Sequence, residues 1–238
     1  MDRIFNMDNK FFQFMGRIAD LMLLNVLCIV CCIPVITIGA SLSSMYYVTL
    51  KMVRDEESYI TRSFFHSFKQ NIKQSIPITL IMLAAGVLLY IDIGIGRSME
   101  GMAGRVLFVM FMFMAILYLM IFIYIHPMLA KFYNSIRNLF VNSLLMGLRH
   151  LPLTFVMMII TAVPLLVLLV PDGRIAAILT LLLILLGIPL MAYAKSMILV
   201  RIFDKYIPAE SEETPSDDLP AAADSPENDP DSKGSDPS

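Results

Sequence analysis

Three cysteines form the densest group of reactive side chains in the sequence. Cys28, Cys31 and Cys32 have the C-x-x-C-C spacing that occurs at redox and metal sites. They lie within a continuous apolar stretch without a fourth ligand nearby, and apolar surroundings disfavour the reactive thiolate. The three histidines are scattered, at His66, His126 and His150. We therefore expect the cysteines to pack inside a helix, and we predict no metal site and no cofactor.

The sequence also lacks the motifs of common nucleotide-dependent and hydrolytic enzymes. It contains no G-x-x-x-x-G-K-[ST] segment, whose backbone amides cradle phosphates, and no G-x-S-x-G nucleophile elbow. Acidic residues stand next to one another only at 55–57 and near the C-terminus, so no pair of carboxylates is set apart for acid–base catalysis. We expect no enzymatic activity and no catalytic residue.

Two polar side chains interrupt the apolar parts of the sequence. Asp92 lies within an apolar stretch, and a carboxylate inside a membrane is a functional candidate by default. Because Asp92 is only a turn from Gly96 and Arg97, we expect it at the membrane interface; a substrate or ion-coupling role is the alternative. Asn25 lies in the first apolar stretch, where we expect its amide to hydrogen-bond between helices.

The composition indicates that lipid surrounds most of the chain. Of the 238 residues, 58% are hydrophobic and only 16% are charged, whereas soluble domains carry about 25% charged residues. A helix needs about 20 apolar residues to cross a bilayer, and five runs come close, at 21–38, 76–95, 106–125, 151–170 and 175–194. The runs do not alternate as strands of a membrane barrel would. We predict an all-α membrane protein, a bundle of five to six transmembrane helices.

The distribution of basic residues favours six spans over five. Pro34 and Gly39 interrupt the first run, and the semi-polar segment 40–53 would then cross back. The predicted spans lie near 18–33, 40–53, 76–95, 106–125, 151–170 and 175–194. Without Lys233 of the tail, one side of the membrane then holds 14 Lys and Arg and the other holds 3, and the basic side faces the cytoplasm. Both termini are therefore predicted to be cytoplasmic.

Two polar segments predict amphipathic helices at the cytoplasmic face, near 56–74 and 131–149. In the first, phenylalanines recur at helical spacing with cations on other faces, which is typical of a helix at a lipid interface. We predict that this helix contacts membrane lipids or docks onto another protein. The predicted contact residues are Arg54, Arg62, Phe64, Phe65, Phe68, Lys69 and Asn71.

The chain divides into a membrane domain, 1–206, and an acidic tail, 207–238. The tail holds ten acidic residues and one lysine, and this composition predicts disorder. The membrane domain is basic, which on a hydrophobic protein favours contact with anionic lipid. No basic run carries interleaved aromatic residues, so we predict no nucleic-acid partner. The sequence leaves the oligomeric state open.

The first third of the chain resembles the YesL-like family of bacterial integral membrane proteins, the DUF624 group. The resemblance is carried by the segments 19–25, 34–40, 46–51, 54–57 and 64–71, and it is strong over residues 10–75. Over 76–206 only hydropathy and length agree. The family has no known function and no established catalytic residues, but its members are often encoded near carbohydrate uptake systems of the ATP-binding-cassette type.

The resemblance implies a multi-pass protein of the bacterial plasma membrane that is associated with carbohydrate uptake. Together with the missing catalytic motifs, it predicts a non-enzymatic accessory or assembly partner in polysaccharide or oligosaccharide uptake. Its partners would be subunits of an ATP-binding-cassette transporter. The alternative is a small stand-alone transporter or channel for a small solute, with Asp92 and Asn25 lining a path between helices.

Overall fold

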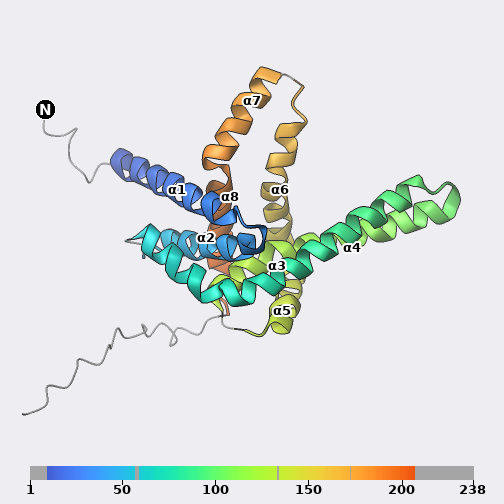
Figure 1. Cartoon of the computed structure of the whole chain (residues 1–238), viewed down its shortest axis with the longest axis horizontal. Helices are drawn as coiled ribbons and strands as arrows, with labels where there is room; N and C mark the ends of the chain where they lie inside the picture. The colour runs from blue at the N-terminus through green and yellow to red at the C-terminus, as the bar shows by residue number, and fades with distance from the viewer. Residues whose placement is uncertain (1–9, 57–58, 133, 172, 207–238) are drawn as a thin grey trace, which may run out of the picture.

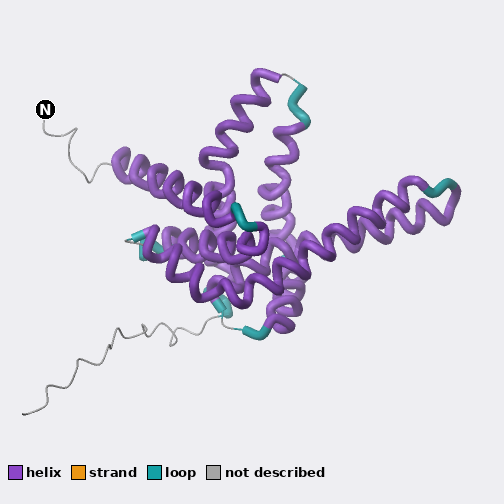
Figure 2. Tube along the Cα trace, viewed as in Figure 1, coloured by secondary structure: helices purple, strands orange, loops and turns teal. Residues whose placement is uncertain are grey.

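A computed structural model describes residues 10–56, 59–132, 134–171 and 173–206. Each of its regular elements is a helix, in agreement with the predicted all-α class (Figure 2). The predicted tail, 207–238, lies outside the described residues. The elements are α1 (Lys10–Cys32), η1 (Val35–Thr37), α2 (Ile38–Val53), α3 (Ile60–Ser98), α4 (Gly101–Lys131), α5 (Ile136–Arg149), α6 (Leu151–Leu168), α7 (Gly173–Leu182), η2 (Leu183–Gly187) and α8 (Ile188–Phe203).

The helices meet around α2, and the longer ones extend outward from this meeting point (Figure 1). α3 and α4 form a hairpin that projects to one side, and α6 pairs with the α7–η2–α8 segment in a second projection. The loops are confined to the ends of the helices (Figure 2). Most side chains of the two projections are apolar and exposed, as expected for helices that face lipid.

α2 is the buried centre of the fold and contacts α1, α3, α4 and α8. Of its 16 residues, 11 are buried, and many of these carry small or hydroxyl side chains. Such side chains allow helix backbones to approach closely. The hydroxyls are satisfied: Ser43 donates to the Gly39 carbonyl at 2.8 Å, and Thr49 shares a 2.8 Å hydrogen bond with Ser196 of α8.

The predicted break after the first apolar run is present and turns the chain back. α1 ends at Cys32, and the single-turn 3-10 helix η1 leads into α2. The Thr37 hydroxyl donates to the Cys31 carbonyl at 2.7 Å. This bond satisfies one of the last carbonyls of α1, which have no hydrogen-bond partner within the helix. Cys28 is buried, and the Ser41 hydroxyl donates to its carbonyl at 3.0 Å. The cysteines are free thiols.

α3 differs from the prediction of an interfacial helix followed by a separate span. It runs without interruption from Ile60 to Ser98, through Pro77. A proline inside a helix costs about 3 kcal/mol. Here the buried positions keep a spacing of three or four residues across Pro77, so one continuous stripe packs against the core. The free energy gained by this packing exceeds the cost of the proline. The stripe comprises Ile60, Phe64, Ser67, Asn71, Ser75, Ile78 and Met82.

Four described helical segments are long and apolar enough to cross a membrane, and a fifth is formed if α5 and α6 count as one bent span. α5 and α6 meet at an angle of 105°. α2, the additional span of the six-span prediction, has 16 residues and is about 24 Å long. This is shorter than the hydrocarbon core of about 30 Å. The sequence thus predicts five to six spans, whereas four to five described helical segments meet the requirements of length and composition.

The packing of α2 on α3 predicts a steric effect at Gly39. A methyl group there would collide with the Thr79 hydroxyl and lie 3.2 Å from the Ser75 carbonyl oxygen. We expect Gly39→Ala to lower the free energy of unfolding in detergent by about 1–3 kcal/mol, as overpacking does. Gly94→Ala is the matched control, because no atom lies within 4 Å of its added methyl group. Equal stability of the two variants would contradict the close packing.

Candidate functional site

The first third of α3 carries most of the predicted contact residues and has two distinct faces. On the inner face Phe64 is fully buried and stacks on Phe68 with ring centroids 6.2 Å apart. Asn71 is also buried, and its Nδ2 donates to the Ser67 hydroxyl at 3.1 Å. This face therefore belongs to the core of the protein.

The prediction that Phe64 and Asn71 contact lipid or a partner is corrected by this burial. Both side chains point into the fold, and Phe68 is half-buried between the two faces. Helical spacing identifies a shared face but does not say whether lipid or protein covers it. No pattern in the sequence indicates that α2 covers the inner side of α3, because the segment 40–53 is itself predicted to be a span.

Arg54, another predicted contact residue, joins the ends of two helices. Its guanidinium pairs with Asp204, just after α8, and lies 3.8 Å from the Glu56 carboxylate. Only 16% of the Arg54 side chain is exposed. Arg54 therefore links the C-terminal end of α2 to that of α8 and is not available as a surface contact.

The outer face of α3 retains three of the predicted contact residues. Arg62, Phe65 and Lys69 are exposed, and Lys73 continues the same face one turn further on. Their spacing of three or four residues places them in one row. The row contains three cations and one aromatic ring, and 40% of Phe65 is exposed. We call Arg62, Phe65, Lys69 and Lys73 the α3 face.

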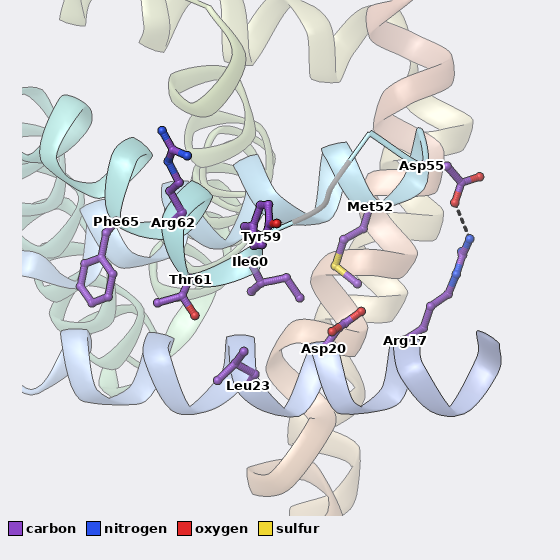
Figure 3. A pocket seen from close by; sticks show the side chains of 10 residues that line it. All are labelled: Arg17, Asp20, Leu23, Met52, Asp55, Tyr59, Ile60, Thr61, Arg62 and Phe65. Atoms are coloured by element: carbon purple, nitrogen blue, oxygen red, sulfur yellow. Dashed lines mark hydrogen bonds and ion pairs between the residues drawn. The ribbon is translucent and has the colours of Figure 1, made fainter. Parts of the chain in front are cut away.

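A cavity of about 790 Å³ lies beside the α3 face, between α1 and the start of α3 (Figure 3). We call this cavity the α1–α3 groove. In Figure 3 the side chains of Asp20 and Leu23 project from α1 toward Met52 and Ile60. The described lining residues are Arg17, Asp20, Leu23, Met52, Asp55, Tyr59, Ile60, Thr61, Arg62 and Phe65.

One end of the groove is polar and is fixed by Arg17. Its guanidinium pairs with the Asp55 carboxylate at 2.5 Å and donates to the Tyr193 hydroxyl of α8 at 2.8 Å. Asp55 has φ of 57°, a left-handed conformation that Asp and Asn tolerate better than most residues. The described lining has two guanidinium groups and two carboxylates but no thiol or imidazole. The groove is therefore suited to binding rather than to nucleophilic chemistry.

Asn25 supplies hydrogen bonds to backbone carbonyls that a proline leaves without donors. Its Nδ2 donates to the carbonyl oxygens of Ile184 and Leu185, both at 2.6 Å. In α-helical pairing the Leu185 carbonyl accepts from residue 189, and in the π-helical pairing of η2 the Ile184 carbonyl does so. Residue 189 is a proline and has no N–H. Asn25 thus joins α1 to η2 where the backbone needs donors.

Asp92 lies on the last third of α3, in the projecting hairpin with α4. Close packing of this hairpin is seen at Gly96, where an added methyl group would lie 3.1 Å from the Phe108 backbone. The free end of the hairpin points away from α1 and η2, the two elements that Asn25 joins (Figure 1). Asp92 is partly exposed. The structure therefore does not bring Asp92 and Asn25 together.

The burial of two ionisable residues, Lys195 and His126, was not predicted from the sequence. Lys195 of α8 is 8% exposed, and His126 of α4 is 5% exposed. Lys195 shares a buried face of α8 with Leu199 and Ile202. It was missed because the predicted span ended at 194, whereas α8 continues to Phe203. The signal available in the sequence was the repeat of Lys195, Leu199 and Ile202 at helical spacing.

The contact between Asn25 and η2 predicts a coupling with Pro189. Asn25→Ala should lower the free energy of unfolding by about 1–2 kcal/mol, because two partly buried carbonyls lose their donor. In a Pro189→Ala background the restored N–H can serve one of them, so Asn25→Ala should cost less. Thermal unfolding of the four proteins in one detergent measures this.

Thr161→Ala is a control for this cycle, since the Thr161 hydroxyl bonds the Met157 carbonyl of its own helix, at 2.7 Å. Its cost should be the same in both backgrounds. A cost of Asn25→Ala that is unchanged by Pro189→Ala would show that Asn25 does not replace the missing donor.

Comparison with known proteins assigns a family to the part of the chain that holds these features. No curated protein and no solved structure matches the chain. A profile of the family described as "Protein of unknown function, DUF624" matches residues 21–93. The matched region runs from the middle of α1 through α2 and most of α3, and it includes the α3 face. Residues 21–93 are therefore similar to the DUF624 family, in agreement with the resemblance that the sequence carries over its first third.

Proposed function

We propose that this protein is a non-enzymatic accessory or assembly partner in bacterial carbohydrate uptake. It is embedded in the plasma membrane with both termini in the cytoplasm. Its partner is a subunit of an ATP-binding-cassette transporter for polysaccharides or oligosaccharides, the class of system near which the family is often encoded. The partner binds the α3 face, which lies in the matched region of the chain.

The observation that carries this proposal is the exposed basic and aromatic row on α3. Arg62, Phe65 and Lys69 are exposed, although the opposite side of the same helix is packed in the core. Aromatic residues and arginine are enriched at protein interfaces. A row fixed on a packed helix also presents these groups without a large loss of conformational freedom on binding.

The length of α3 supports placing this face beyond the hydrocarbon core. With 39 residues, α3 is about 58 Å long, roughly twice the thickness of the hydrocarbon core. The apolar part of the helix, 76–95, is long enough to cross. The preceding residues, 60–75, then extend past the bilayer and carry the α3 face to the cytoplasmic side, where a soluble or membrane partner can reach it.

Polar contacts among the predicted cytoplasmic segments support the proposed orientation. Arg17 pairs with Asp55, Gln74 donates to the Asn134 carbonyl, and His150 bonds the Tyr206 hydroxyl at 3.0 Å. Arg54 and Asp204 add a fourth such contact. Each joins segments that the charge distribution assigns to the cytoplasm: 1–20, 51–75, 126–150 and 195–206. A single polar side is what the positive-inside rule requires.

The alternative, a stand-alone transporter or channel with Asn25 and Asp92 along one path, receives less support. Asn25 uses its amide to bind the carbonyls of η2, and Asp92 belongs to the projecting hairpin. If the alternative held, Asp92→Asn would abolish solute flux into vesicles that contain the protein alone. We expect no such flux in the first place.

Co-purification tests the docking proposal. We expect the wild-type protein, extracted in mild detergent from cells grown on an inducing carbohydrate, to recover a transporter subunit detectable by mass spectrometry. Arg62→Gln with Lys69→Gln should reduce recovery about tenfold, because two cationic contacts of an interface are lost.

Arg97→Gln serves as the matched control for co-purification, since it removes a cation from the opposite end of α3. It should leave recovery unchanged. If the wild-type protein recovers no transporter subunit, or the double variant recovers as much as the wild type, the docking proposal is wrong.

A further inference from the structure

We propose that a pocket between α5 and the residues that follow α8 binds an anionic phospholipid of the phosphatidylglycerol class. The pocket has a volume of about 330 Å³, within the range of about 300–1,000 Å³ for ligand sites, and we call it the α5 pocket. Its described lining shares no residue with the α3 face or with the α1–α3 groove. The inference therefore goes beyond the proposed function and does not depend on it.

Polar side chains of the α5 pocket have hydrogen-bonding groups that no described residue occupies. Arg149 stacks on the Tyr206 ring, with its Cζ atom 5.4 Å from the ring centroid. This contact uses the flat face of the guanidinium, so its N–H donors remain for a ligand. Asn134 accepts a hydrogen bond from Gln74 on its backbone carbonyl, and its side-chain amide and that of Asn142 are without a described partner. The pocket thus presents a guanidinium and two amides.

The guanidinium of Arg149 is held in place before a ligand arrives. The Tyr206 hydroxyl forms a 3.0 Å hydrogen bond with Nε2 of His150, the residue that joins α5 to α6. The two rings also meet edge to face, with centroids 5.9 Å apart. Tyr206 is therefore fixed against the end of α5, and Arg149 stacks on it. A cation that is already ordered loses less conformational entropy when it binds.

The charges around the α5 pocket favour a negative ligand. From the start of α4 to Tyr206, the described part of the chain contains a single acidic residue, Asp204, and its carboxylate pairs with Arg54. No described carboxylate pairs with Arg149. Lys205, next to Tyr206 in the chain, is exposed and adds a second cation. A guanidinium binds a phosphate through two parallel hydrogen bonds, so a phosphodiester suits this end of the pocket.

The rest of the α5 pocket is apolar and continues onto an exposed apolar surface. Phe132, Leu145 and Met146 line it, and Leu145 is 57% exposed. Val141 and Leu148, both also exposed, lie four and three residues from Leu145 and therefore share its side of α5. Such a row on a helix at a membrane contacts acyl chains. A ligand that has a phosphate and an acyl chain fits both parts of the site.

α5 connects two apolar helices at one face of the membrane. α4, which ends at Lys131, is long and apolar enough to cross. α6 begins at Leu151, has 18 residues without a charged side chain and forms an angle of 105° with α5. α5 therefore runs across the direction of α6 instead of continuing it, which places the α5 pocket at the level of the headgroups. The charge distribution assigns this side to the cytoplasm, where the leaflet carries anionic lipid.

The α5 pocket should distinguish anionic from zwitterionic phospholipids. Phosphatidylcholine and phosphatidylethanolamine have the same phosphodiester but add a cationic group. The described lining offers no carboxylate to that group, and Arg149 and Lys205 would repel it. Phosphatidylglycerol instead adds two hydroxyls, which can donate to the amide oxygens of Asn134 and Asn142.

Native mass spectrometry of the full chain tests this preference with three dioleoyl lipids: phosphatidylglycerol, phosphatidylcholine and phosphatidylethanolamine. The wild-type protein should retain the first about tenfold more than either of the others, because a charged hydrogen bond is at stake. Arg149→Gln should reduce this preference to near unity. Arg137→Gln is the matched control, since it removes an exposed cation from the other end of α5, outside the described lining. It should leave the preference unchanged.

A second variant keeps the test decisive if Arg149→Gln fails to fold. Asn142→Ala removes one amide from the pocket and should lower the preference about threefold, as the loss of a neutral hydrogen bond does. Equal retention of the three lipids by the wild-type chain overturns the proposal, and this result is also expected if the acidic segment 207–238 takes the pocket. The proposal is equally wrong if Arg137→Gln loses as much preference as Arg149→Gln, if both pocket variants elute and bind like the wild type, or if an equal concentration of soluble glycerophosphoglycerol displaces the lipid.

Discussion

The close packing of α2 against the inner stripe of α3 is the interaction on which the rest of the fold depends. α2 has small and hydroxyl side chains where it meets its neighbours. The hydroxyls form hydrogen bonds within α2 or with α8, which satisfies polar groups for which lipid offers no partner. At Gly39 the approach leaves no room for a methyl group. Because α3 is fixed in this way, its outer row and the neighbouring groove have a defined orientation.

The packing of α3 on α2 also agrees with the proposed binding function, because it holds the α3 face in a fixed position. The polar contacts that close the fold, from Arg17 to Asp55 and from Arg54 to Asp204, tie together the ends of α1, α2 and α8. The α3 face adds three exposed cations, Arg62, Lys69 and Lys73, on the outer side of a packed helix. In the proposed function, a partner protein meets this row.

Much of the fold could be predicted from the sequence, because apolar run length and proline position act locally. The all-helical class and the turn after Cys32 were predicted in this way, and the family resemblance came from the sequence segments of the first third. The continuity of α3 through Pro77 could not be predicted, since it depends on packing against α2. Phe64 and Asn71 were placed on the outside for the same reason. The role of Asn25 depends on Pro189, which is 164 positions further along the chain, and Lys195 lay just beyond a predicted span boundary.

Spin labels placed singly along residues 60–82, in the membrane-reconstituted protein, measure whether α3 is one helix with one buried side. Labels at 64, 67, 71, 75, 78 and 82 should be immobile and labels at 62, 65, 69 and 73 mobile and open to water, with the helical period unbroken at Pro77. Mobile labels at 64 and 71, or a change of phase at 77, would show a separate interfacial helix and contradict the packing of α3 on α2.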